Sequence, residues 1–155
     1  MQNENNASPF QKELKSLRVM HLGLMAGLAI VLLNMLFLNN FQLKPALDTL
    51  VLVALFLAVA APLAVQAFIL PQLLAAAKSK TGLQQKWNAY RTYAIMSYAI
   101  LEGPALVNVV VYFLTQSYYC LIAALLLLVL LVRLAPNREK VISDLELSPA
   151  EAAEF

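Results

Sequence analysis

The sequence predicts an all-α integral membrane protein: an up-down bundle of four transmembrane helices with both termini in the cytoplasm. Hydrophobic residues make up 61% of the 155-residue chain and charged residues only 13%, and the mean hydropathy is +0.71. Soluble domains carry about 25% charged residues. This balance, together with four long apolar stretches, argues against an ordinary cytosolic enzyme fold.

The apolar stretches define the predicted spans, because a helix needs roughly 20 apolar residues to cross a hydrocarbon core about 30 Å thick. The first stretch is too long for the core of a signal peptide and is interpreted as an uncleaved anchor. The last is short, but Tyr118, Tyr119 and Arg133 can reach the two interfaces. The predicted organisation is a polar cytoplasmic tail at 1–17, disordered up to Pro9, a membrane domain at 18–134 with spans at about 19–38, 50–77, 92–114 and 118–132, and a cytoplasmic tail at 135–155.

The positions of the basic residues predict the orientation. Every Lys and Arg except Lys44 precedes the first span, lies between the second and third, or follows the fourth. Because cytoplasmic loops hold the excess of basic residues, both tails and the middle loop are expected in the cytoplasm. The chain is thus predicted to be a multi-pass protein of the cytoplasmic (inner) membrane, in which short links make consecutive helices antiparallel neighbours.

The first span carries Gly23, Gly27 and Asn34 on one stripe. Small residues at this spacing let a second helix approach closely, and an Asn amide adds a hydrogen bond in lipid. We favour packing within the bundle over a dimer interface.

Pro62 and Pro71 interrupt the second span. Each removes a backbone hydrogen bond and bends the helix. The bends either shape the helix alone or mark a binding site, as broken helices do in transporters.

Glu102 is the most informative residue, because it lies ten residues into the third span and therefore near the bilayer centre. Tyr98 and Asn108 share a polar arc of the same helix with it, and Tyr98 is one turn away. Pro104 frees a carbonyl beside the acid, which predicts a locally irregular backbone.

Two interpretations of Glu102 stay open. In the first, the side chain is a proton or cation site, with Tyr98 and Asn108 nearby. In the second, it is neutral and donates a structural hydrogen bond to Asn34, Gln66 or Gln72.

From Pro71 to Thr115 the layout resembles the hairpin of rotary ATPase c subunits, the proteolipids. A basic loop from Lys78 to Arg91 precedes a helix with a mid-membrane acid in the sequence Ala99-Ile100-Leu101-Glu102-Gly103-Pro104-Ala105-Leu106. The resemblance implies proton or sodium binding by Glu102. It is local, since the glycine repeats and the Arg-Gln-Pro loop of that family are absent and two further spans flank the hairpin.

The second tail predicts short helices. Asn137 is placed to cap a helix running to about Leu147, and Ser148 and Glu151 form a capping box for the next turn. The tail is expected to lie at the headgroups or against the middle loop, or alternatively to dock a partner.

Catalytic motifs are absent from the sequence, and one His and one Cys offer no metal or haem pair. His21 is interpreted as an interfacial polar residue and Cys120 as an apolar filler. We therefore expect a non-enzymatic subunit or scaffold of a membrane assembly, with no cofactor, metal or nucleic acid. Its expected partners are the lipid bilayer and either a further copy of the chain or other membrane proteins. The alternative is a proton- or cation-coupled translocating component that uses Glu102.

Overall fold

The structure is a computed structural model that describes residues 9–154, and this part of the chain is helical without a named strand. The predicted disorder of residues 1–8 lies outside the described residues. The helices are α1 (Pro9–Leu38), α2 (Thr49–Ala64), the π-helical turn η2 (Val65–Ile69), α3 (Leu70–Lys78), α4 (Leu83–Thr115), α5 (Tyr118–Arg133), α6 (Arg138–Leu145) and α7 (Pro149–Glu154).

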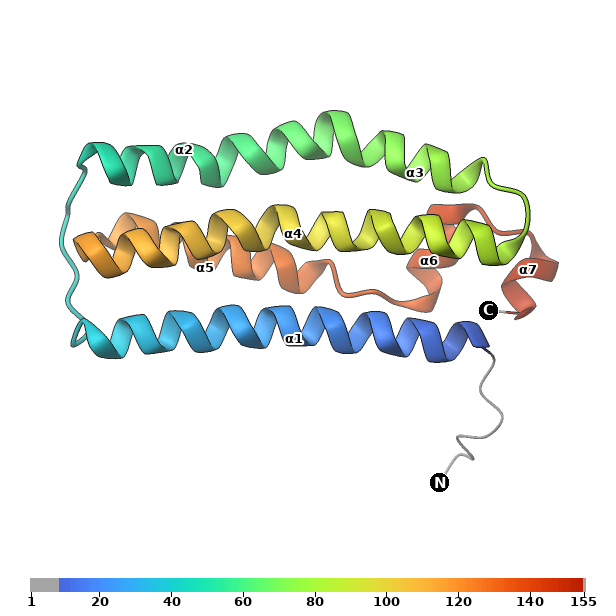
Figure 1. Ribbon diagram of the computed structural model, residues 1–155, viewed down its shortest axis with the longest axis horizontal. Helices are drawn as coiled ribbons and strands as arrows, with labels where there is room; N and C mark the ends of the chain where they lie inside the picture. The colour runs from blue at the N-terminus through green and yellow to red at the C-terminus, as the bar shows by residue number, and fades with distance from the viewer. Residues whose placement is uncertain (1–8, 155) are drawn as a thin grey trace, which may run out of the picture.

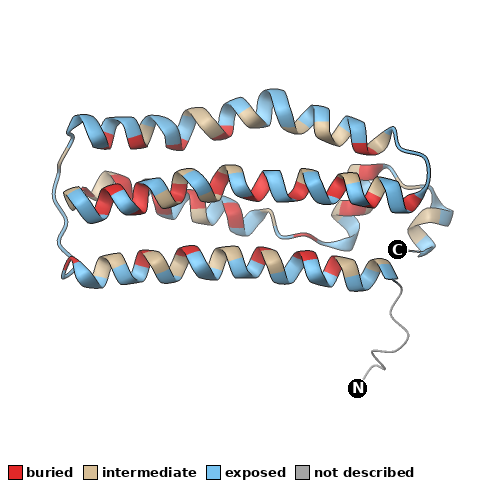
Figure 2. Ribbon diagram, viewed as in Figure 1, coloured by how far each residue is buried: buried red, intermediate tan, exposed pale blue. Residues whose placement is uncertain are grey.

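The long helices lie side by side, with α4 at the centre (Figure 1). α4 packs against α1, α2, α3 and α5. One end of the molecule holds α6, α7 and the start of α1, and we call it the tail end; the opposite end is the link end. Figure 2 shows the buried residues on the sides of the helices that face one another.

The expectation that consecutive helices are neighbours is wrong for α1 and α2. Among the described residues α1 packs on α4 and α5 but makes no extensive contact with α2. The link begins with a turn at 39–41 and continues as an irregular segment at 42–48, which at about 3.3 Å per residue is long enough to pass over the end of the molecule.

Backbone pairing fixes this link. Lys44 N–H donates to Gln116 O (2.8 Å), and Tyr118 N–H donates to Lys44 O (3.2 Å). The Ser117 hydroxyl adds a bond to Ala46 O (2.7 Å). The two links of the link end therefore hold each other.

α1 and α4 extend well beyond the predicted spans at the tail end. The spans at 19–38 and 92–114 were bounded by hydropathy, but the helices begin at Pro9 and Leu83. Both added segments are amphipathic, with Leu14, Leu17 and Trp87 buried. The predicted tail at 1–17 therefore includes two turns of helix.

The second span is bent, as its prolines predict, whereas the third is not. η2 lies between Pro62 and Pro71, where five residues form a π-helical turn. α4 runs through Pro104 as one α-helix, so the irregular backbone expected beside Glu102 is not found.

α5 has 16 residues, about 24 Å of helix, and the chain then turns by 81° into α6. Val141 and Leu145 of α6 are fully buried beneath the ends of the longer helices. Three helical stretches (α1, α2 through α3, and α4) are long and apolar enough to cross a membrane, and α5 adds a fourth only when counted together with α6.

Candidate functional site

Glu102 lies on α4 at the edge of its exposed face. Its side chain is half-buried and makes no hydrogen bond or ion pair with any residue in the described range. The neighbouring Ala99 and Gly103 are exposed, and a Cβ added at Gly103 would meet nothing within 4 Å. The expected bonds to Asn34, Gln66 or Gln72 are absent, so the carboxyl group forms no polar contact with the described residues.

Tyr98 faces away from Glu102, into the interior. It is 2% exposed, and its ring lies 4.6 Å from the ring of His21, centroid to centroid. It forms no hydrogen bond with Glu102, although the two residues are one turn apart.

Asn108 ties α4 to α2. Its amide donates to Ala54 O (3.0 Å) and to Pro104 O of its own helix (2.9 Å), and the residue is fully buried. Interhelical amide bonds of this kind fix helix packing in lipid. Asn108 therefore has a structural role, and Tyr98, Glu102 and Asn108 do not form one site.

The glycine stripe of α1 packs against no other helix in the described part of the chain. Gly23 and Gly27 are exposed, with no atom within 4 Å of an added Cβ. Asn34 is also exposed and donates to Ile30 O of its own helix (2.8 Å). Packing within the bundle, the interpretation favoured from the sequence, is therefore wrong for this stripe.

The prolines are used in different ways. Pro62 is buried in α2, Pro104 is half-buried in α4, and Pro71 is exposed and lines a groove.

His21 lies in the interior of the bundle and not on its surface. It is 1% exposed, and neither ring nitrogen has a hydrogen-bond partner among the described residues. Its spacing from the buried Leu14, Leu17 and Leu28 is helical. That periodicity was available in the sequence and places His21 on the inner face.

A groove of about 430 Å³ opens beside the π-helical turn, and we call it the π-turn groove. Its volume falls within the range of about 300–1,000 Å³ typical of ligand pockets. It is lined by Gln66, Leu70, Pro71, Leu74, Tyr93, Ser97 and Leu134. Only the two prolines hint at this groove in the sequence, because Tyr93, Ser97 and Leu134 are distant from them along the chain.

A cavity of about 10 Å³ adjoins the π-turn groove and shares Tyr93, Ser97 and Leu134 with it. Tyr90, Ala94, Tyr98 and Lys140 complete its lining. This volume is at the lower limit for one water molecule.

Charged contacts hold α6 and α7 against the tail end. Lys78 Nζ lies 2.6 Å from Glu146 Oε1, and Lys86 Nζ lies 2.7 Å from Glu151 Oε1. The Tyr90 hydroxyl donates to Asp144 (3.0 Å). The tail therefore packs against the middle loop and α4, as the first sequence-based interpretation expected.

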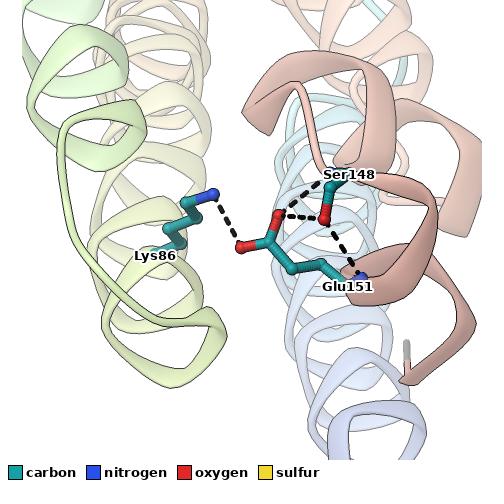
Figure 3. A network of polar contacts seen from close by, with 3 residues as sticks. All are labelled: Lys86, Ser148 and Glu151. Atoms are coloured by element: carbon teal, nitrogen blue, oxygen red, sulfur yellow. Dashed lines mark hydrogen bonds and ion pairs between the residues drawn. The ribbon is translucent and has the colours of Figure 1, made fainter.

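Both predicted caps of the tail are formed. Asn137 accepts from Lys140 N–H (2.6 Å), and Ser148 and Glu151 bond reciprocally (Figure 3). Hydrogen bonds from Lys86 and Ser148 lower the pKa of Glu151 to about 2. A hydrogen bond from Lys78 lowers the pKa of Glu146.

No protein-family model, no curated protein and no solved structure matches this chain.

Proposed function

We propose that α1, α2 with α3, α4 and α5 form an up-down bundle in the cytoplasmic membrane, with both termini in the cytoplasm. The support is the length and apolarity of the helices and the placement of every Lys and Arg except Lys44 and Arg133 at or near the tail end.

We further propose that the protein is a non-enzymatic subunit of a membrane assembly, which binds another membrane polypeptide along the exposed face of α4. One observation carries this proposal: Glu102, which the proposed topology puts near mid-bilayer, has no polar partner among the described residues and borders the exposed Ala99 and Gly103. An ionised acid at this depth costs roughly 2.5–3.5 kcal/mol on insertion scales, and such residues normally pair or face a polar space. A hydrogen-bond donor on a neighbouring helix meets this requirement.

Site-specific photo-crosslinking in native membranes tests the interface. A benzophenone side chain at Ala99, one turn from Glu102, is expected to give a discrete adduct with a second copy or another membrane protein. The matched control at Leu125, exposed on α5, is expected to give lipid adducts only. Equal yields of protein adduct at the two positions, or none at Ala99, would reject the interface.

A second function is favoured by the accessibility of the same carboxyl group. Because Glu102 is half-exposed and unpartnered in the described part of the chain, it is accessible to a proton or cation, as the local resemblance to c subunits implies.

Glu102→Gln separates the two functions. If Glu102 serves assembly, the Gln variant keeps the Ala99 adduct, because its amide still forms hydrogen bonds. The Glu102→Leu variant, which has no hydrogen-bonding group, is then expected to lose the adduct. An ion-binding role predicts sodium-protected labelling of Glu102 by a carbodiimide, and no labelling of the Gln variant.

A further inference from the structure

We propose that the π-turn groove binds one anionic glycerophospholipid from the surrounding bilayer, with an acyl chain along its apolar wall and the phosphate near Lys140 and Arg133. This site is separate from the exposed face of α4 around Glu102 and does not depend on the proposed assembly.

The groove exists because two elements leave the side of α4 uncovered. The π-helical turn bends the second span, so that α3 continues against α4 but makes no extensive contact with α5 in the described residues. α5 ends at Arg133, and the chain turns away into α6. Tyr93 and Ser97 of α4 form the floor of the space between them.

The position of the groove selects a ligand that resides in the membrane. Gln66, Leu70 and Leu74 follow one another at four-residue intervals, so they form one stripe along a membrane-spanning helix. A molecule that enters between this stripe and Leu134 approaches from the side of the helices. Leu70, Leu74 and Leu134 offer an apolar wall that suits an acyl chain.

The polar side chains that line the groove differ in their contacts, and the Ser97 hydroxyl donates to Tyr93 O (2.8 Å). The Gln66 amide makes no hydrogen bond to any described residue, which is costly at membrane depth, where water does not replace the missing partner. The ester and glycerol oxygens of a phospholipid are acceptors for this amide. The groove thus matches a ligand with an apolar chain and a polar linkage.

A cation beside the groove favours an anionic headgroup. Lys140 lines the adjoining cavity, and Arg133 directly precedes Leu134. Neither cation forms an ion pair in the described range, and the nearby Asp144 accepts the Tyr90 hydroxyl. Basic pockets between membrane helices bind anionic lipid headgroups in this way.

Native mass spectrometry of the full chain, released from micelles with equal amounts of phosphatidylglycerol and phosphatidylcholine, tests the proposal. The expected result is a single phosphatidylglycerol adduct retained in several-fold excess over phosphatidylcholine. Equal retention of the two lipids, or a random ladder of adducts, would overturn it.

Variants locate the lipid. Lys140→Ala and Arg133→Ala are each expected to reduce phosphatidylglycerol retention about fivefold, whereas Lys80→Ala, which removes a charge at the same end outside the groove, leaves it unchanged. Leu74→Trp fills the groove and is expected to abolish the adduct. An unchanged adduct in Leu74→Trp, or an equal loss in Lys80→Ala, would contradict the assignment. If a variant does not fold, the comparison of the two lipids on the unaltered chain still decides.

Discussion

The Lys86 ammonium lies 2.7 Å from the Glu151 carboxylate and joins α4 to the last described helix of the chain. Both side chains are largely covered, with 15% and 25% of their surfaces exposed. Because Glu151 also caps its own helix through Ser148, one carboxylate both starts α7 and attaches it to α4 (Figure 3).

Glu151→Gln is therefore expected to loosen α7. The neutral amide loses the charge-assisted bond to Lys86, which is stronger than a neutral one. Hydrogen exchange of the amides at 149–154 should become severalfold faster. Glu154→Gln, which removes a charge from the same helix without an observed ion pair among the described residues, is the control and should leave exchange unchanged. Equal protection in the two variants would show that the pair does not hold α7.

The same contact predicts an acid-sensitive tail. The pKa of Glu151 is about 2 in the folded protein, against 4.5 for the free side chain. A lowered folded pKa contributes stability that is fully present above about pH 4.5 and is lost as the pH falls toward 2. Limited proteolysis of the tail should be constant from pH 7 to 5 and should increase below pH 4.5, with an acid-stable protease. Lys86→Gln should weaken this pH dependence, and an unchanged profile would exclude the ion pair as its cause.

Leu145→Ala is expected to detach α6 from the tail end. The side chain is 1% exposed, and truncating a buried Leu costs about 2–5 kcal/mol. Exchange of the 138–145 amides measures the loss. Leu147→Ala, at a half-buried position just beyond the helix, should have a clearly smaller effect.

Asn108→Ala should weaken the contact between α4 and α2. Interhelical hydrogen bonds in membranes contribute about 0.6 kcal/mol on average and at most about 1.7. Unfolding in mixed micelles should therefore show a loss of about 1 kcal/mol. Asn34→Ala, where the amide bonds only to its own helix, should be nearly neutral, and a larger loss there than at Asn108 would contradict the assignment.

His21→Phe is expected to stabilise the protein. The ring keeps its contact with Tyr98, while the two unpartnered nitrogens, each a buried polar group that costs about 1–3 kcal/mol, are removed. A higher midpoint of thermal unfolding is the expected result. A lower midpoint would mean that the imidazole has a polar partner in the membrane.

The sequence predicted the helical class and the limits of two membrane stretches, α2 with α3 and α5. Each is an apolar run that begins after Asp48 or Ser117 and ends at a basic residue, so the position of its ends is narrowly defined. It underestimated α1 and α4, because a helix continues through polar residues as long as one face is buried. Hydropathy alone does not reveal this.

The candidate site was predicted less well. The helical wheel placed Tyr98, Glu102 and Asn108 on one arc, but that arc faces different neighbours at successive turns: His21, open space and α2. The open face of Gly23 and Gly27 and the π-turn groove depend on which helices are neighbours, and a single helix sequence does not contain that information.

The central claim is that the chain crosses the membrane four times with its two ends on one side. In a Cys120→Ala background, single cysteines replacing Lys12, Lys44, Lys80 and Ala150 can be labelled in intact cells with a membrane-impermeant maleimide. Four crossings with both ends in the cytoplasm predict labelling of the Lys44 position from outside, and of the other three only after the membrane is opened. Labelling of the Lys12 and Ala150 positions from opposite sides would contradict it.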